Sequence, residues 1–596
     1  MGQAQHGGES NYAQNVNEGA GTSTGQPPQD RNRDEETHGM DTAEDMDEDE
    51  GFAARYPVRA RKRPCTWWRN QREVIARINV AAEIKEPNSY QEAITGPHGH
   101  AWKKAMDEEI LAQMTNGTWE VGVPPPEVNV LPCRWVYKVK TNPDGSVDRF
   151  KARLVAKGCA QREGVDYGEL FAPTSRGSSF RALLAVAAAR ELNLHQLDVS
   201  TAFLNGDLKE IWMKQPQGYN SDMPGAACRL IKSIYGLKQA SRCWYDKLCE
   251  KFAEIGLRPA KADQAMFTKV EEGEQVYVLV HVDDMCIAAR EMKTIKKIKE
   301  EIGRMFKVRD LGEISTFLGM EVRRCDDGDI TLSQSRYVDR ILEKHGMKDA
   351  KPRVIPVAVG AKLGMEDESE MLTDPTPYRA LVGELNYLAV STRPDLGFAL
   401  SILSRHMAKP SKMDMGVAKG VLLYVAGTKE LGLRFKKEEV ENIDGYCDSD
   451  WAGDKESRRS TTGYVFRING TAVSWSSQLQ RTVATSSVEA EYQALSAAVR
   501  EALWLNKLCG DMDINNTRMK IWVYSQGAMN LGKNPINSSR TKHVDVQHHV
   551  VRERIARGEV VLAYCRTEEM VADTLTKALP EMKFSSCRYE MGMDVT

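Results

Sequence analysis

The 596-residue sequence lacks the signals of a membrane protein, a secreted protein or a disulfide scaffold. It has no run of about 18 apolar residues, which excludes an ordinary membrane-spanning helix. Its polar N-terminus has no apolar signal core, so secretion is not expected. The twelve cysteines include no Cys-x-x-Cys pair, which argues against zinc knuckles and disulfide frameworks. We therefore expect an intracellular protein with reduced thiols and no membrane partner.

Charge is distributed unevenly along the chain. Residues 1–50 contain 13 acidic and 2 basic residues, a net charge of −11, whereas the whole chain has −3. The remaining residues therefore carry +8, the difference between −3 and −11, which is compatible with nucleic-acid binding. We predict that residues 1–88 form a disordered acidic tail and a basic linker. The basic run Arg59–Arg63 is either a nuclear-localisation signal or a solvated linker, so cytoplasmic and nuclear residence both stay open.

Two adjacent aspartates, Asp283 and Asp284, interrupt an apolar run that begins at Val276 and resumes at Met285. Strands disfavour Asp, whereas turns tolerate it because its side chain can bond the nearby backbone. We predict a β-hairpin whose tight turn carries both aspartates. Such a turn is either plain and solvated, or its two carboxylates hold a cation together with a third ligand.

Asp198 is the candidate for that third ligand. The pattern predicts a helix over Ser179–Leu192, followed by an apolar strand that ends at Asp198. Three aspartates on two strand segments can hold two divalent cations about 3.5–4 Å apart, a pair that activates a primer 3′-hydroxyl and neutralises a triphosphate. Oxygen ligands favour Mg²⁺ or Mn²⁺. We predict Asp198 and Asp283 as the ligand pair; the alternative is that Asp198 merely ends a strand.

A second hairpin carries basic residues. Residues 133–140 and 148–156 alternate in the manner of strands around a turn at 142–145. One face is apolar and the other carries Lys138, Lys140, Arg149, Lys151 and Arg153. Such a face either contacts phosphates or is simply solvated.

Five segments, three of which contain the features described above, together resemble the reverse transcriptase of copia-type LTR retrotransposons. The likeness extends from about Trp102 to Phe584. The five segments are WVYKVKTNPDGSVDRFKARLVAKG (135–158), LHQLDVSTAFLNGDL (194–208), IYGLKQASRCWY (234–245), LVHVDDMCIA (279–288) and FLGMEV (317–322). The resemblance implies an α+β multidomain chain with a right-hand reverse transcriptase of fingers, ferredoxin-like palm and thumb. It implies reverse transcriptase over 89–360, a helical connection over 361–440, a ribonuclease H-like α/β domain over 441–584 and a C-terminal tail over 585–596.

The resemblance also implies an RNA-directed DNA polymerase that uses two Mg²⁺ or Mn²⁺ ions in each active site. Its partners would be an RNA template, a DNA or tRNA primer and dNTPs. By this likeness Asp198 and Asp283 are metal ligands, and Asp284 is the catalytic aspartate beside them. His281 stands where the family has Tyr near the primer terminus, and we expect it to alter efficiency more than chemistry.

The same likeness implies four nucleotide-binding residues. Phe203 resembles the aromatic steric gate that excludes a ribose 2′-hydroxyl, and Gln239 resembles a polar contact to the incoming nucleotide. Lys151 and Arg153 correspond to finger residues that meet its phosphates.

A second set of carboxylates lies in the C-terminal third, where the segments DSDWAGD (448–454), RRSTTGYVF (458–466), SSVEAEYQAL (486–495) and VADTLTKAL (571–579) resemble ribonuclease H. The likeness implies catalytic Asp448, Glu491 and Asp573, with metal ions on Asp448 and Glu491; Glu489 is the less favoured alternative to Glu491. Tyr524 stands where the family has another Asp. A phenol does not supply an anionic oxygen at neutral pH, so we expect poor cleavage of an RNA–DNA hybrid.

Two hypotheses follow. The first is an active RNA-directed DNA polymerase, favoured by the intact palm aspartates. The second is a catalytically inactive retroelement remnant that keeps the fold and binds nucleic acid. Signatures of a nucleocapsid, protease or integrase do not occur, so we expect a C-terminal piece of a polyprotein or a truncated copy. The histidines His543, His548 and His549 are interpreted as structural rather than as zinc ligands, and the oligomeric state stays open.

Overall fold

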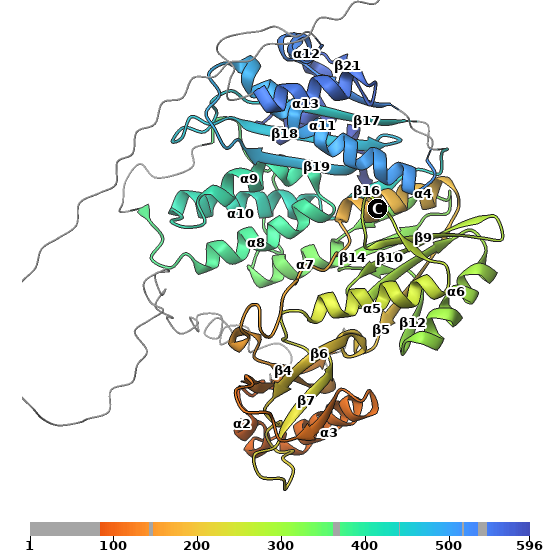
Figure 1. Ribbon diagram of the computed structural model, residues 1–596. Coiled ribbons are helices and arrows are strands. Elements are labelled where there is room, and N and C mark those ends of the chain that lie inside the picture. The colour runs from red at the N-terminus through yellow and green to blue at the C-terminus, as the bar shows by residue number, and fades with distance from the viewer. Residues whose placement is uncertain (1–83, 142–146, 362–369, 440–441, 515–517, 534–544) are drawn as a thin grey trace, which may run out of the picture. The chain divides into compact units, whose positions relative to one another are not determined.

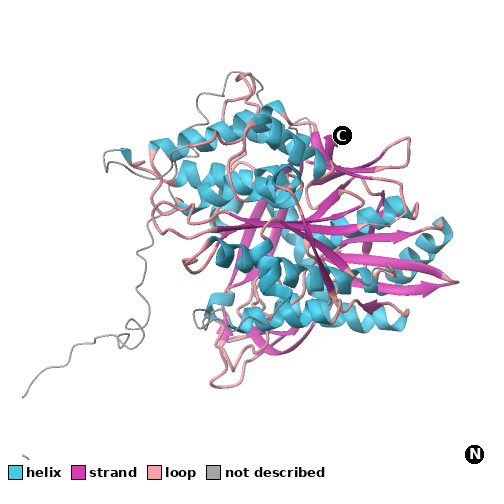
Figure 2. Cartoon of the chain, turned by 90° about the horizontal axis from the view of Figure 1, so that it is seen from above, coloured by secondary structure: helices cyan, strands magenta, loops and turns pink. Residues whose placement is uncertain are grey.

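The computed structural model describes residues 84–141, 147–361, 370–439, 442–514, 518–533 and 545–596. These residues belong to one compact unit, Glu83–Thr596. Helices and strands are interspersed along them in a mixed α/β architecture (Figure 2). The predicted tail up to residue 83, the run Arg59–Arg63, the turn at 142–145, His543 and the side chains of His548 and His549 lie outside the described residues. No helix in the described part is long and apolar enough to cross a bilayer.

The first described region combines two helices, a hairpin and a small sheet. Helices α2 (Tyr90–Thr95) and α3 (Gly99–Thr115) are separated at the Gly96-Pro97 pair, as the sequence predicts. The predicted basic hairpin is confirmed as the antiparallel strands β3 (Cys133–Thr141) and β4 (Val147–Ala156). The sheet has the order β1–β7–β6–β2. Its strands are β1 (Trp119–Gly122), β2 (Val130–Leu131), β6 (Asp207–Met213) and β7 (Ala227–Lys232).

The central sheet has the order β12–β5–β11–β10–β9–β8, and each neighbouring pair is antiparallel. Figure 1 labels β5, β9, β10 and β12 of this sheet. Its strands are β5 (Asn193–Val199), β8 (Arg258–Pro259), β9 (Met266–Glu271), β10 (Glu274–His281), β11 (Asp284–Ala289) and β12 (Val308–Glu313). Helices α5 (Ala240–Glu254) and α6 (Met292–Met305) fall between these strands in the chain. The elements β5, α5, β10, β11, α6 and β12 have a β-α-β-β-α-β order, and the sheet is extended by β8 and β9, which lie between α5 and β10 in the chain.

Successive side chains of a strand point to opposite faces, and this alternation divides the central sheet between two cores. Leu197 and Met285 pack with apolar residues of α5 and α6. Leu194 and Cys286 join the core that includes α4 (Gly177–Ala189). Asp198 follows the alternation of Leu194, so it lies on the α4 side at the end of its strand, where it is half-buried.

A third sheet joins distant parts of the chain in the order β13–β14–β15–β16–β22. Its strands are β13 (Thr316–Phe317), β14 (Met320–Arg324), β15 (Ile330–Ser333), β16 (Leu431–Phe435) and β22 (Met593–Val595). Helices α7 (Ser335–Lys344), α8 (Thr376–Ser391), α9 (Gly397–Arg405) and α10 (Lys412–Gly427) precede β16 in the chain. A short 3₁₀ turn (Pro394–Leu396) separates α8 from α9, at a proline that cannot continue the preceding helix.

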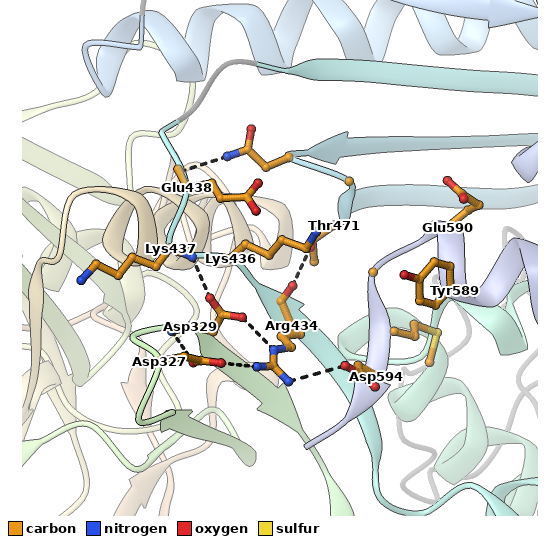
Figure 3. Close-up of a pocket in the computed structure, with 14 residues that line it drawn as sticks. Asp327, Asp329, Arg434, Lys436, Lys437, Glu438, Thr471, Tyr589, Glu590 and Asp594 are labelled. Carbon is orange, nitrogen blue, oxygen red and sulfur yellow. Dashed lines mark hydrogen bonds and ion pairs between the residues drawn. The ribbon is translucent and has the colours of Figure 1, made fainter.

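A groove of about 600 Å³ runs beside this third sheet. Arg434 lies at its base and pairs with Asp327, with Asp329 at 2.7 Å and with Asp594 at 3.5 Å (Figure 3). The pair with Asp594 links β16 to the C-terminal strand β22, and the pairs with Asp327 and Asp329 link β16 to the connection between β14 and β15. None of the predicted site residues lines the groove.

The C-terminal sheet has the order β19–β18–β17–β20–β21, antiparallel from β19 to β17 and parallel from β17 to β21. Its strands are β17 (Ile443–Ser449), β18 (Thr461–Ile468), β19 (Thr471–Leu479), β20 (Met519–Val523) and β21 (Val560–Tyr564). The accompanying helices are α11 (Ser487–Asp511), α12 (Gln526–Lys533), α13 (Asp545–Ala556) and α14 (Glu581–Glu590), with a 3₁₀ helix at Val571–Leu575.

The predicted tail at 585–596 requires correction. The boundary after residue 584 falls inside α14, whose Phe584 and Cys587 are buried, and β22 pairs with β16. Strand β22 has three residues, which is too short for an alternating apolar pattern to predict it from the sequence. Its backbone pairing with β16 places it in the sheet. The end of the chain is thus part of the fold.

Candidate functional site

The hairpin β10–β11 positions the adjacent aspartates. His281 pairs with Asp284, so the connecting loop consists of Val282 and Asp283 alone. The prediction is right for Asp283 and wrong for Asp284, which is the first residue of β11. Val282 has φ +61°, which is unusual for a β-branched residue, and the Trp244 indole donates a 2.7 Å hydrogen bond to its carbonyl. The hydrogen bond from Trp244 of α5 therefore stabilises the strained backbone of this turn.

Asp198 and Asp284 are direct cross-strand partners on β5 and β11. The Val199 amide also donates a 2.8 Å hydrogen bond to the carbonyl of Asp283, which fixes the turn against the end of β5. Burial, and then the charge of Asp283, raises the pKa of Asp198 and also that of Asp284. The structure thus brings the three predicted aspartates together at one strand end.

Basic residues surround this palm cluster, by which we mean Asp198, Asp283 and Asp284. Arg309 on β12 is the partner of Asp198 across the strand, and Lys151 reaches the neighbourhood from the β3–β4 hairpin. Both oppose the rise in the pKa of Asp198. Burial, followed by repulsion from Arg153, lowers the pKa of Lys151 itself. Arg309 was not predicted as a site residue. It lies beside Asp198 only because β12 pairs with β5, and the two residues are more than a hundred positions apart in the sequence.

Phe203 lies on a short 3₁₀ turn (Ala202–Asn205) that directly follows the strand carrying Asp198. Its ring meets that of Tyr235 edge to face at 5.1 Å, and the Arg153 guanidinium lies 5.1 Å from the Tyr235 ring. The predicted residues Phe203 and Arg153 therefore both contact the ring of Tyr235. Tyr235 itself was not predicted as a site residue.

Gln239 is buried, and both ends of its amide are bonded within the protein. Its Oε1 accepts from Gln161 at 2.9 Å, and its Nε2 donates to the carbonyl of Asp166 at 2.9 Å. The side chain thus ties α5 to the loop that follows β4. In this structure, neither amide end is free for the predicted contact with a nucleotide.

Two further contacts involve the hairpin. His281 Nδ1 lies 3.1 Å from the hydroxyl of Ser175. The Gln196 amide donates to Asp284 Oδ1 at 3.4 Å. Gln196 could have been found from the sequence, because it lies two residues before Asp198 and therefore on the same face of the strand.

The second cluster, here called the C-terminal cluster, consists of Asp448, Glu491 and Asp573. Asp448 is the penultimate residue of β17, Glu491 lies in the first turns of α11, and Asp573 lies on the 3₁₀ helix Val571–Leu575. All three are buried. Burial raises the pKa of Asp448 to about 6 against the effect of Lys577. Burial and the charge of Asp448 raise the pKa of Glu491 to about 9.

Glu489, the less favoured candidate, has a different environment. Its carboxylate accepts from the amide and hydroxyl of Thr485 at 2.8 and 2.6 Å, so it caps the start of α11. Glu491 instead faces the core. This difference agrees with the choice of Glu491.

Lys577 is the residue of this cluster that sequence reasoning missed. Its ammonium lies 2.6 Å from Asp573 Oδ1 and 3.5 Å from Asp448 Oδ2. Thr576 Oγ1 also donates to Asp448 Oδ2. Burial alone would lower the pKa of Lys577, but the two carboxylates outweigh it and raise that pKa. The spacing of four residues between Asp573 and Lys577 is the signal that could have revealed the pair.

Tyr524 immediately follows β20, whose Val523 is the parallel partner of Cys447, so Tyr524 is next to Asp448 in register. Its side chain is 45% exposed. The structure thus brings Tyr524 to the edge of the C-terminal cluster, in the strand position where the resemblance implies a carboxylate.

The two clusters differ in their suitability for a metal ion. Within the described residues, no group of three His, Cys, Asp or Glu side chains is arranged around one metal position. Mg²⁺, however, uses one or two carboxylates together with substrate phosphates, which the palm cluster can accommodate. In the C-terminal cluster, the buried Oε2 of Glu491 has no hydrogen-bond partner among the described residues, which leaves this oxygen available to a water or a cation.

Comparison with known proteins identifies the class. Residues 116–359, which include the palm cluster, match the family model described as reverse transcriptase (RNA-dependent DNA polymerase). The chain is 38% identical over 520 residues to the retrovirus-related Pol polyprotein from transposon RE1 of Arabidopsis thaliana, covering 87% of this chain and 35% of that protein. A putative transposon Ty5-1 protein of Saccharomyces cerevisiae is 32% identical over 308 residues, which is 51% of this chain and 100% of that protein.

The chain therefore belongs to the family of copia-type retrotransposon Pol proteins and contains its reverse transcriptase domain. It spans about a third of the length of the RE1 polyprotein. Among solved structures, a foamy viral protease–reverse transcriptase in complex with double-stranded DNA is 13% identical with a TM-score of 0.45, covering 78% of this chain and 70% of that chain.

Proposed function

We propose that the chain is an RNA-directed DNA polymerase whose active site is the palm cluster. The observation that carries the proposal is the two-residue hairpin turn, which holds Asp283 beside Asp198 at the end of a β-α-β-β-α-β unit. In this assignment residues 89–360 are fingers, palm and thumb, and 361–440 are the connection. The ribonuclease H-like domain begins at residue 441 and extends past residue 584, because α14 and β22 belong to the fold.

Asp198 and Asp283 would hold a pair of Mg²⁺ or Mn²⁺ ions, with Asp284 next to them. When bound, the cations would lower the charge of the triphosphate and the pKa of the primer 3′-hydroxyl. The raised pKa values of Asp198 and Asp284 support this, because burial and then the charge of Asp283 disfavour the ionised forms, and a bound cation would favour them again. The bond from Trp244 would keep the turn in its strained conformation during turnover.

The chain's other residues would orient the substrates. Lys151 and Arg153 would bind the phosphates of the incoming dNTP, and Phe203, braced by Tyr235, would close against a 2′-hydroxyl. The RNA template and the DNA or tRNA primer would lie on the basic side of the β3–β4 hairpin. Gln239 would act indirectly by fixing α5 rather than through a free amide.

Primer extension tests the proposal. The full chain, with native folding verified by circular dichroism, is incubated with poly(rA)/oligo(dT), dTTP and Mg²⁺ or Mn²⁺. Incorporation of dTMP that requires both the RNA template and the metal supports it. A folded chain that incorporates nothing under either metal would instead support the inactive remnant.

We also propose that the ribonuclease H-like domain folds but cleaves an RNA–DNA hybrid poorly. The proposal is supported by Tyr524 at the strand position next to Asp448, because a phenol offers no anionic oxygen there at neutral pH. Incubation of the full chain with a labelled hybrid and Mg²⁺ measures this directly. Cleavage as fast as that of an intact four-carboxylate ribonuclease H would refute the proposal.

A further inference from the structure

The ammonium of Lys577 lies where the carboxylates of the C-terminal cluster converge. It is 2.6 Å from Asp573 Oδ1 and 3.5 Å from Asp448 Oδ2, while Lys583 lies 3.9 Å from the other oxygen of Asp573. Buried carboxylates require a positive partner, because charge is costly to remove from water. Lys577 therefore neutralises the cluster from within the chain.

The position of Lys577 differs from that of an ordinary buried ion pair. Its side chain is 42% exposed, whereas those of Asp448 and Asp573 are only 4% exposed. It reaches into the cluster from the surface through a flexible chain of four methylenes. Such a side chain can leave the cluster without disturbing the packing of the core.

The cluster still has an unused oxygen. Glu491 is 8% exposed, and its Oε2 has no hydrogen-bond partner although it is buried. Lys577 bonds Asp448 and Asp573 but no contact joins it to this oxygen among the described residues. The cluster therefore retains a ligand that a cation other than Lys577 would use.

We propose that the Lys577 ammonium is a tethered counter-ion that occupies the cation position of the C-terminal cluster and competes with divalent metal ions for it. Tyr524 strengthens this competition, because one carboxylate fewer leaves less charge to attract a metal ion. Removal of the ammonium leaves Asp448, Glu491 and Asp573 without their nearest cation, so a divalent ion binds there more tightly.

The inference rests on the proposed ribonuclease H-like assignment for the kind of cation, but its test does not depend on cleavage or on polymerisation. A chain that fails to extend a primer can still bind Mn²⁺ at the C-terminal cluster. The two failures are therefore distinguishable.

Mn²⁺ titration followed by electron paramagnetic resonance provides the test. The full chain carries Asp198→Asn and Asp283→Asn, so that binding at the palm cluster does not contribute. In this background we expect Lys577→Met to lower the apparent Kd for Mn²⁺ by about tenfold or more. Lys577→Arg keeps the positive charge and should bind Mn²⁺ as weakly as the background. The matched control is Lys507→Met, which removes an exposed lysine of α11 and should also leave the Kd unchanged.

Thermal unfolding supplies a second readout. Without metal the Lys577→Met variant should unfold at a lower temperature than the background, and Mn²⁺ should restore more of its stability than it adds to the background. If Lys577→Met folds only when Mn²⁺ is present, the inference is supported. If it does not fold in either condition, Lys577→Gln replaces it in both measurements. A folded neutral variant that binds Mn²⁺ no more tightly than the background overturns the inference.

Discussion

The palm cluster and the C-terminal cluster present similar carboxylates in different environments. Asp198 and Asp284 are half-buried at the end of a strand pair, and the cations near Asp198, Lys151 and Arg309, come from other strands. Asp448 and Asp573 are almost completely buried and are already paired with Lys577. The C-terminal cluster contains the ammonium of Lys577, whereas the palm cluster has no such ion pair among the described residues and can take cations from solution. We therefore expect the two clusters to differ in their affinity for a divalent metal ion, although they share residue types.

The largest expected effect is at the palm cluster. Asp283→Asn keeps the size of the side chain but removes an anionic ligand, so we expect primer extension to fall about a thousandfold or more. Asp310→Asn is the matched control, because Asp310 lies on β12 of the same sheet but pairs with Lys299. Extension by the Asp283→Asn variant at the rate of the control would remove Asp283 from the active site.

At the C-terminal cluster we expect a gain of activity. The double variant Tyr524→Asp, Lys577→Met restores a carboxylate and removes the competing ammonium, so hybrid cleavage with Mg²⁺ should rise about tenfold to a hundredfold. Tyr524→Phe, which adds no charge, should leave cleavage at its original level. If the double variant cleaves the hybrid no faster than Tyr524→Phe, then neither Tyr524 nor Lys577 accounts for the poor cleavage.

Discrimination between sugars should depend on Phe203. Phe203→Ala opens space beside the nucleotide, so we expect the preference for dTTP over UTP, measured as a ratio of kcat/KM values, to fall about tenfold. Tyr235→Phe retains the edge-to-face contact and serves as the control. An unchanged ratio in the Phe203→Ala variant would exclude Phe203 as the steric gate.

The smallest effect is expected at His281. It bonds Ser175 rather than an aspartate of the cluster, so His281→Tyr should change the kcat/KM of extension by less than about fivefold. The dependence of the rate on Mg²⁺ concentration should stay the same. A shift in that dependence would mean that His281 affects the metal ligands, and Ser175→Ala would show whether its hydrogen bond is responsible.

Much of the fold could be predicted because local patterns coincide with it. The apolar run before Asp283 predicts β10, and the Gly96-Pro97 pair marks the break between α2 and α3. The left-handed conformation of Val282 could not be predicted, since a β-branched residue disfavours it and only tertiary contacts such as the Trp244 bond maintain it. Local propensity contains no information about such a contact.

Long-range pairing limited the prediction of the site in the same way. Asp283 and Asp284 were found because they interrupt an apolar run, and Asp198 was found because it ends an apolar strand. Arg309 and Tyr235 were missed because their positions follow from strand order and ring contact between distant segments. Lys577 could have been inferred from its spacing after Asp573, but the pattern does not show that its ammonium also reaches Asp448.

Mn²⁺ binding to the unaltered chain tests the central comparison most directly. The chain is bound to an RNA template with a dideoxy-terminated primer and dTTP, and Mn²⁺ is titrated by electron paramagnetic resonance alongside the Asp283→Asn and Asp448→Asn variants. We predict that Asp283→Asn loses the tightly bound Mn²⁺ and that Asp448→Asn retains it. Tight binding that survives Asp283→Asn but disappears in Asp448→Asn would contradict the account.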